Sequence, residues 1–343
     1  DQGDSWTDIV GATTTTLTIP SITNTMDGYK YRAIFTNRIG SVTSAEARLT
    51  VNYLAWENLT LQNGWTTYDS VYSAPSYIKT SDGVVVLKGL IKNSNTSAEG
   101  KVIATLPVSY RPSATLVFPS SAYLNSYARI DVNSNGEIIY ISGGSETWLS
   151  LENIRFIPDT GRYVRTAINS FLNGWSNFGS SFAPVSYVVD NSERVNIQGM
   201  MNIGTLTDDT PIFDMPTNLA PPQYLHIPAA GGIFGSFGIT LEQILAKGSG
   251  SSGLSIQTMY YPATYNSWIN LSLQSQSGWV AFGSGYSTPQ YTKSADKLVS
   301  LKGLIKSGTT TSGTIIATLP AGYRPGARLL ITGVSVHSYC RID

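Results

Sequence analysis

The 343-residue chain has little charge and a single cysteine, and each scarcity excludes a class of protein. Basic and acidic residues number 22 each, and charged residues make up 13% of the sequence, against roughly 25% in an average soluble protein. A nucleic-acid-binding protein needs a basic face to neutralise phosphates, so this balanced, sparse charge argues against nucleic acid as a partner. Because Cys340 is the only cysteine, no disulfide can form within the chain, and its domains must rely on their cores.

Long apolar runs, metal-ligand spacings and catalytic motifs are also missing. No apolar run approaches the roughly 18 to 20 residues that span a bilayer, so we predict no membrane insertion. The two histidines, His226 and His337, have neither metal-site spacing nor a nucleophile motif, so we predict no metal, no cofactor and no catalytic residue. We interpret the acidic pair Asp208-Asp209 as a solvated turn, because calcium needs more oxygen ligands. Carboxylates that meet only in space keep a polysaccharide-degrading enzyme as a remote alternative.

The sequence does contain one segment that is repeated three times. Each copy opens on Gly-Trp, runs through an aromatic residue, a proline and a tyrosine, reaches a strand-like run ending in glycine, and finishes on two prolines. The spacing between equivalent landmarks is 109 or 110 residues for copies one and two, and 104 for copies two and three. Because insertions would shift landmarks unequally, the copies share one backbone. The landmarks are Trp65, Gly89, Pro107 and Pro112; Trp175, Gly199, Pro216 and Pro221; and Trp279, Gly303, Pro320 and Pro325.

Inside a copy, the sequence alternates strand and turn. Runs rich in β-branched residues, such as 83–91 and 102–106, are separated by Gly, Asn and Pro at the spacing of a sandwich or jelly roll. We expect 241–247, which has some helical character, to be a strand, and 248–253 to be a loop tip. The prediction is an all-β string of β-sandwich domains: an immunoglobulin-like part at 1–52, repeat one at 53–161, a divergent repeat two at 162–264 and a truncated repeat three at 265–343.

Repeat three stops at Asp343, the equivalent of Asp131 in repeat one, and the first module lacks its early strands. We therefore expect the sequence to be a segment of a longer polypeptide. Cys340 falls where repeat one has Ala128, so we expect it to be a small buried residue.

The first fifty residues have a different pattern, with alternating strand-like runs at 13–20, 27–35 and 45–51. This pattern resembles the second half of an immunoglobulin-like domain of the bacterial and phage type. The resemblance implies a tyrosine corner at Tyr31 and a scaffold role, with Ala33 at the second-cysteine position of disulfide-free members.

Repeats one and three share a second sequence motif, Ile-Ala-Thr-Leu-Pro followed by Tyr-Arg-Pro, at 103–112 and at 316–325. With the Gly-Trp opening, the motif resembles a β-sandwich module of phage tail-fibre and baseplate proteins, which has relatives in bacterial surface proteins. The resemblance covers Trp56 to Asp343 and implies a host-facing head or a spacer, often trimeric. Repeat two has Leu219-Ala220 in place of Tyr-Arg, so it is either a spacer or a specialised site.

Two recurrent groups are candidate glycan contacts, although we favour a structural role for both. A tryptophan at one fixed place of each repeat packs in a core or offers a stacking face to a sugar. A Tyr-Arg pair between two prolines stabilises the domain edge or contacts sugar hydroxyls. The candidates are Trp65, Tyr110, Arg111, Trp175, Trp279, Tyr323 and Arg324.

The sequence favours a non-enzymatic fibre or adhesion protein, extracellular or on a virion surface, with attachment, glycan-binding or spacer modules. The expected partners are a host or cell-surface glycan and further copies of the chain, with a trimer as the leading arrangement. A purely structural stalk or filament subunit and a bacterial adhesin are the alternatives.

Overall fold

The computed structural model describes residues 6–19, 22, 26–51, 55–94, 98–144, 147–231, 235–240, 243–247, 254–265, 267–294, 296–335 and 338–343. Over these residues the regular structure is strands joined by turns and short 3-10 segments, without an α-helix, so the all-β prediction is confirmed. None of the helical segments in the described residues has the length and hydropathy needed to cross a bilayer.

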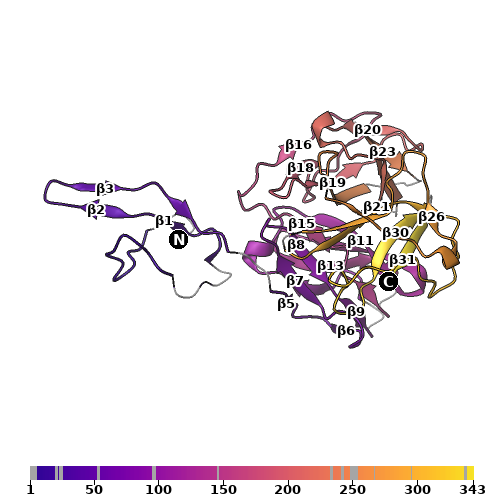
Figure 1. Cartoon of the computed structure of the whole chain (residues 1–343), viewed down its shortest axis with the longest axis horizontal. Coiled ribbons are helices and arrows are strands. Elements are labelled where there is room, and N and C mark those ends of the chain that lie inside the picture. Colours follow the sequence, from indigo (N-terminus) through magenta and orange to yellow (C-terminus); the bar gives the residue numbers. More distant parts are fainter. Residues whose placement is uncertain are drawn as a thin grey trace.

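The N-terminal module projects away from the remainder of the chain as a thin ribbon (Figure 1). Its strands are short and pair only in twos, and the hairpin side chain Phe35 is 65% exposed. Residues 14–16 form a bend and the remainder of 13–19 is irregular, so the predicted strand is not formed there, because no described strand lies beside these residues to accept backbone hydrogen bonds. The pairs are β1 (Lys30–Tyr31) with β4 (Ala47–Arg48), and β2 (Ile34–Thr36) with β3 (Ser41–Thr43).

Repeat one is a two-sheet sandwich around one apolar core. Its elements are β5 (Glu57–Asn58), β6 (Trp65–Thr67), β7 (Ser76–Lys79), β8 (Val85–Lys88), β9 (Leu90–Asn93), β10 (Val102–Thr105), η2 (Val108–Tyr110), β11 (Leu116–Ala122), η3 (Tyr123–Asn125), β12 (Ser126–Val132), β13 (Glu137–Ser142), β14 (Leu149–Ser150) and β15 (Arg155–Phe156). One sheet has the order β10-β13-β12-β11-β14-β9-β6 and the other β15-β8-β7-β5.

The chain passes from one sheet of repeat one to the other at Gly89. Its φ of +122° suits glycine alone, and a Cβ there would lie 2.5 Å from the Cα of Pro75. A glycine that ends a strand-like run indicates either a bulge or a close backbone approach, and at Gly89 the structure has the close approach.

Among the described residues, repeat two makes the same pairings with nine strands in place of eleven. Its elements are β16 (Thr166–Ala167), β17 (Ser176–Asn177), β18 (Ser186–Val189), β19 (Val195–Asn202), β20 (Pro211–Asp214), η4 (Thr217–Leu219), β21 (Leu225–Gly231), β22 (Gly235–Ile239), β23 (Gln243–Lys247) and β24 (Leu254–Tyr260). Because β19 takes the places of both β8 and β9, the two sheets join into one. The strand expected at 241–247 is confirmed for β23, whereas 241–242 and the loop tip 248–253 lie outside the described residues.

Repeat three contains β25 (Ile269–Asn270), η5 (Ser275–Ser277), β26 (Val280–Ala281), β27 (Gln290–Lys293), β28 (Val299–Lys302), β29 (Ile305–Lys306), β30 (Ile331–Ser335) and β31 (Ser338–Ile342). They form three small sheets, β25-β27-β28, β26-β29 and β30-β31.

Cys340 is exposed, so the expectation of a buried residue there is wrong. Its counterpart Ala128 is fully buried, because β13 pairs with β12 and Gly144 packs over the alanine. Among the described residues β31 pairs only with β30, and no strand covers the thiol in that way.

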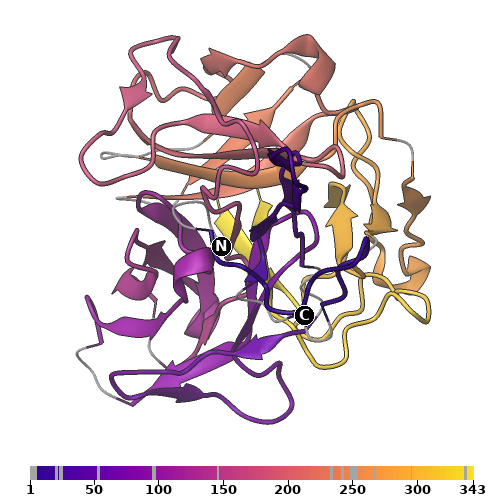
Figure 2. The same ribbon diagram turned by 90° about the vertical axis from the view of Figure 1, so that its left-hand side faces the viewer.

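The three repeats close into a ring, which Figure 2 shows as three lobes around a common centre. The strands β11, β21 and β30, at one equivalent place in each repeat, contact one another. Adjacent repeats are also joined by parallel bridges at equivalent positions. From one repeat to the next, the first partner of the bridge shifts by 109 and then 104 residues, and the second partner by 110 and then 104 residues, which is the repeat spacing. The bridges are Thr115 with Phe182, Tyr224 with Tyr286, and Arg328 with Tyr72.

Equivalent backbone hydrogen bonds and apolar clusters accompany the bridges. At each junction the N–H of the first bridge residue donates to a backbone carbonyl of the neighbouring repeat. The carbonyl of the same bridge residue accepts from the backbone N–H two residues after that acceptor, and all these distances are 2.8 to 3.3 Å. Val117, Met200 and Ala230 pack at one junction, and Leu90, Trp148 and Leu330 at another. The bridge from Arg328 to Tyr72 joins repeat three back to repeat one, so the ring is closed.

Candidate functional site

The recurrent tryptophans lie inside the repeats. The glycine before each has a positive φ, 73° to 82°, which ends a turn. Trp65 then begins β6, and Trp175 and Trp279 directly precede β17 and β26. Trp65 and Trp175 are buried; the first stands edge-on to Tyr140 with centroids 5.8 Å apart, and the indole of the second donates to the Thr205 carbonyl at 3.2 Å. Trp279 is half-buried. These positions support the packing interpretation, because a sugar needs an exposed ring face.

The Tyr-Arg pair of repeat one stabilises the loop between its two prolines. Tyr110 is buried and donates its hydroxyl to Glu57 at 2.9 Å, and Tyr77 donates to the other carboxylate oxygen at the same distance. Burial, together with the hydrogen bond and the charge of Glu57, raises the pKa of Tyr77 to about 12. Arg111 donates its Nε to the Leu106 carbonyl at 2.9 Å. The pair therefore serves the fold of repeat one.

Repeat three copies this geometry with one change. Tyr323 meets Tyr291 edge-on at 4.8 Å, and Arg324 donates to the Leu319 carbonyl at 2.6 Å. Ile269 stands where repeat one has Glu57, so the tyrosine hydroxyls lose their shared acceptor. Arg324 is the exposed member among the seven candidates.

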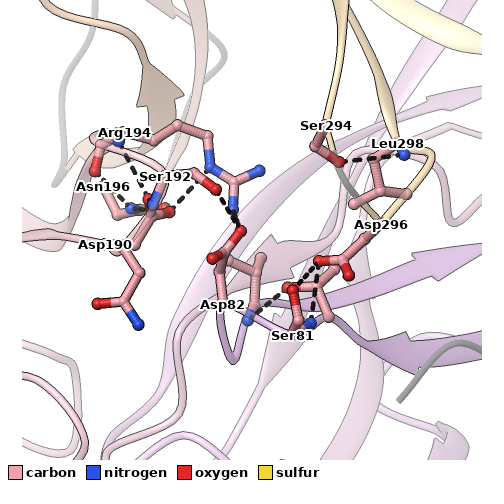
Figure 3. Close-up of polar contacts among 12 residues, drawn as sticks. Ser81, Asp82, Asp190, Ser192, Arg194, Asn196, Ser294, Asp296 and Leu298 are labelled. Atoms are coloured by element: carbon pink, nitrogen blue, oxygen red, sulfur yellow. Dashed lines mark hydrogen bonds and ion pairs between the residues drawn. The ribbon is translucent and has the colours of Figure 1, made fainter. Parts of the chain in front are cut away.

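One loop tip from each repeat contributes to a polar cluster, which is drawn in Figure 3 and is called the axial cluster below. Asp82, Ser192 and Asp296 hold the same position in successive repeats. Ser192 donates its hydroxyl to Asp82 at 2.6 Å, and Ser81 donates its N–H and hydroxyl to Asp296 at 2.9 and 2.7 Å. Polar side chains from all three repeats are thus hydrogen-bonded together.

Arg194 is the cation of this axial cluster. Its guanidinium reaches Asp190 at 2.8 Å and Asp82 at 3.1 Å, which joins repeat two to repeat one. Burial disfavours its charge, but the carboxylates of Asp190 and Asp82 outweigh that effect and raise the pKa of Arg194. Asp190 also accepts from the Asn196 amide at 3.0 Å. With its charges paired and hydrogen-bonded, the cluster suits a structural junction, and the described residues contain no group of acidic, His or Cys side chains that could hold a metal.

The other polar residues singled out in the sequence have local roles. The ring of His226 is hydrogen-bonded to Ser236 at 2.7 Å, between β21 and β22. Asp208 and Asp209 form the predicted turn. His337 lies outside the described residues.

A cavity of about 190 Å³ lies where the N-terminal module meets repeat one, lined chiefly by Asp27, Arg48, Thr50, Lys79, Thr160 and Arg162. Lys79 is buried, donates to the Ser109 carbonyl at 3.1 Å and lies 3.6 Å from Asp27. Burial lowers the pKa of Lys79; Asp27 opposes the shift, and Arg162 and Arg48 reinforce it. Sequence reasoning missed this site, since its residues come from four separated segments without a local motif.

Comparison with known proteins reaches only a small part of the chain. No family model and no solved structure matches it. A stretch of 53 residues, 16% of the chain, is 55% identical to part of endoglucanase C of Cellulomonas fimi. The match covers 5% of that protein's length, so the likeness concerns a short segment of a much longer protein.

Proposed function

We propose that the chain is a non-enzymatic surface protein, a fibre or adhesion module outside the cell or on a virion, that attaches to a glycan. Its N-terminal module is a spacer, and its three repeats form the attachment head. The observation that carries the proposal is the closed ring. Three copies of one fold meet through equivalent contacts, which is the arrangement that a trimeric fibre head makes from three chains.

Three other features support this function. The sequence is poor in charged residues and rich in residues with hydroxyl and amide groups, which suits contact with sugars. The N-terminal ribbon extends beyond the ring, as a spacer would (Figure 1). The 53-residue likeness is to a protein named as an endoglucanase, which agrees with a carbohydrate setting.

A glycan array with the full chain, followed by calorimetry on the glycans retained, tests attachment. We expect selective retention of cell-surface glycans, and no release of reducing ends from any polysaccharide that binds. A chain that retains no glycan in any class is a structural stalk. A chain that releases reducing ends is an enzyme, and either outcome removes the proposal.

The ring also bears on self-association. The edges that would join separate chains in a homotrimer are used inside this chain. We therefore propose that one chain provides a complete three-part head, and light scattering should give the mass of a single chain, 37.0 kDa. A threefold mass would favour the trimer of chains that the fibre resemblance implies.

A further inference from the structure

We infer that the cavity between the N-terminal module and repeat one binds an anionic group of a glycan, a carboxylate or a sulfate. This inference rests on the proposed glycan attachment and names the chemistry of one contact. Arg48, Lys79 and Arg162 line the cavity, whereas Asp27 is its only acidic lining residue. The site therefore has an excess of two positive charges, and a bound anion would neutralise part of it.

The cation at the base of the cavity is built into the fold. The Lys79 side chain is 4% exposed, and its ammonium group lies against Asp27 and the Ser109 carbonyl. Asp27 is itself engaged, because one of its carboxylate oxygens accepts from the Val51 N–H at 3.0 Å. A single carboxylate that is shared in this way cannot balance three cations.

The two arginines supply the directional donors. Within the described part of the chain, no ion pair joins Arg48 or Arg162 to a carboxylate. A guanidinium presents paired N–H groups that match the oxygens of a carboxylate or sulfate. Thr50 and Thr160 add hydroxyl donors at the wall.

The size of the cavity limits what enters. At roughly 30 Å³ for each water in the liquid, its volume of about 190 Å³ admits an oxyanion with part of the sugar ring that bears it. The remainder of an oligosaccharide must lie outside, so we expect recognition of one acidic substituent.

Repeat three provides an internal control. Lys293 occupies the place of Lys79, donates to the Gly322 carbonyl at 2.6 Å and lies 5.5 Å from the centroid of the Tyr323 ring. Lys79 has the matching contacts with Ser109 and, at 5.7 Å, with Tyr110. Lys79 and Lys293 therefore make the same local contacts in their repeats, and only Lys79 has Arg48 and Arg162 beside it in a cavity.

The experiment uses the full chain against three probes: heparin oligosaccharides for sulfate, oligogalacturonate for carboxylate, and dextran as a neutral glycan. We expect one or both acidic probes to bind, with an affinity that falls as salt rises. The double change Arg48→Gln and Arg162→Gln should weaken acidic binding by about tenfold to a hundredfold, the usual loss for hydrogen bonds to charged groups. Arg38→Gln, at an exposed arginine between β2 and β3 of the N-terminal module, should alter it by less than about twofold.

Folding of each variant is checked by circular dichroism. A second measurement, hydrogen exchange of residues 158–163 in the unaltered chain, should show added protection with the acidic probe and none with dextran. Equal acidic binding by the double variant, or the lack of any acidic binding, overturns the inference. If neutral or other glycans are still retained, the general attachment proposal survives that failure; if no glycan is retained, both are lost.

Discussion

Repeats one and three have nearly the same sequence in the strands β8 and β28, yet their cores differ. Leu87 in repeat one is 0% exposed, whereas its counterpart Leu301 is 47% exposed. In repeat one, β13, β14 and β15 complete the two sheets around the leucine, and no described strand of repeat three stands in those places. The local sequence is therefore sufficient for a strand, and burial depends on strands that lie far along the chain.

The first prediction sets the two leucines against each other. Leu87→Ala should destabilise repeat one by about 3 kcal/mol, because it opens a cavity in a closed core. Leu301→Ala should cost less than about 1 kcal/mol in repeat three. Hydrogen exchange read separately for each repeat measures both, since a multi-domain chain has no single free energy of unfolding. Equal losses would mean that the two cores are closed alike.

The second prediction concerns the glycines that follow these strands. In both repeats a Cβ would lie 2.5 Å from a proline Cα, at Gly89 and at Gly303. Gly89→Ala should cost about 2 kcal/mol, because the complete sandwich holds the backbone in place. Gly303→Ala should cost about half of that, since small, incomplete sheets can move apart. Thermal unfolding of each repeat, monitored by the appearance of proteolytic cleavage within it, measures both losses of stability. A larger loss of stability for Gly303→Ala than for Gly89→Ala would contradict the prediction.

The third prediction is a pH dependence confined to repeat one. Burial raises the pKa of Glu152 to about 7, although the Gly89 N–H and Lys88 favour its charged form. A raised folded-state pKa gives stability that is complete below about pH 4.5 and is lost as pH rises towards 7. Repeat two has Gln257 at the equivalent place. The advantage of Glu152→Gln over the natural residue should grow by about 1 to 2 kcal/mol between pH 4 and pH 8, and a pH-independent difference in melting would refute this.

The smallest effect is expected at the tyrosines of the two Tyr-Arg pairs. Tyr110→Phe removes a hydroxyl that donates to Glu57 and should cost about 1 kcal/mol. Tyr323→Phe should be nearly neutral, because Ile269 stands in place of that carboxylate. Hydrogen exchange read separately in repeats one and three decides the matter. Equal shifts would show that the hydroxyl in repeat three has an acceptor of similar strength.

Several features of the fold were predictable from particular residues. The equal spacing of Trp65, Trp175 and Trp279 reveals one backbone used three times, because a duplicated fold preserves its landmarks. The glycine at the end of the strand-like run indicates a bulge or a close approach, and the structure shows the close approach at Gly89. By contrast, the exposure of Cys340 and the irregular backbone of 13–19 were not predicted, because both depend on which strands lie alongside.

The amino-acid pattern alone established an all-β chain of repeated sandwiches, because the alternation of apolar and polar residues, the turn residues and their spacing are local properties that recur in every repeat. The ring, the axial cluster around Arg194 and the cationic cavity at Lys79 arose only from packing. Asp82 and Arg194 are more than a hundred residues apart, and Arg48 and Arg162, from different modules, line one cavity. Contacts over such separations have no signature in the order of residues, since distance in space is set by how whole sheets pack.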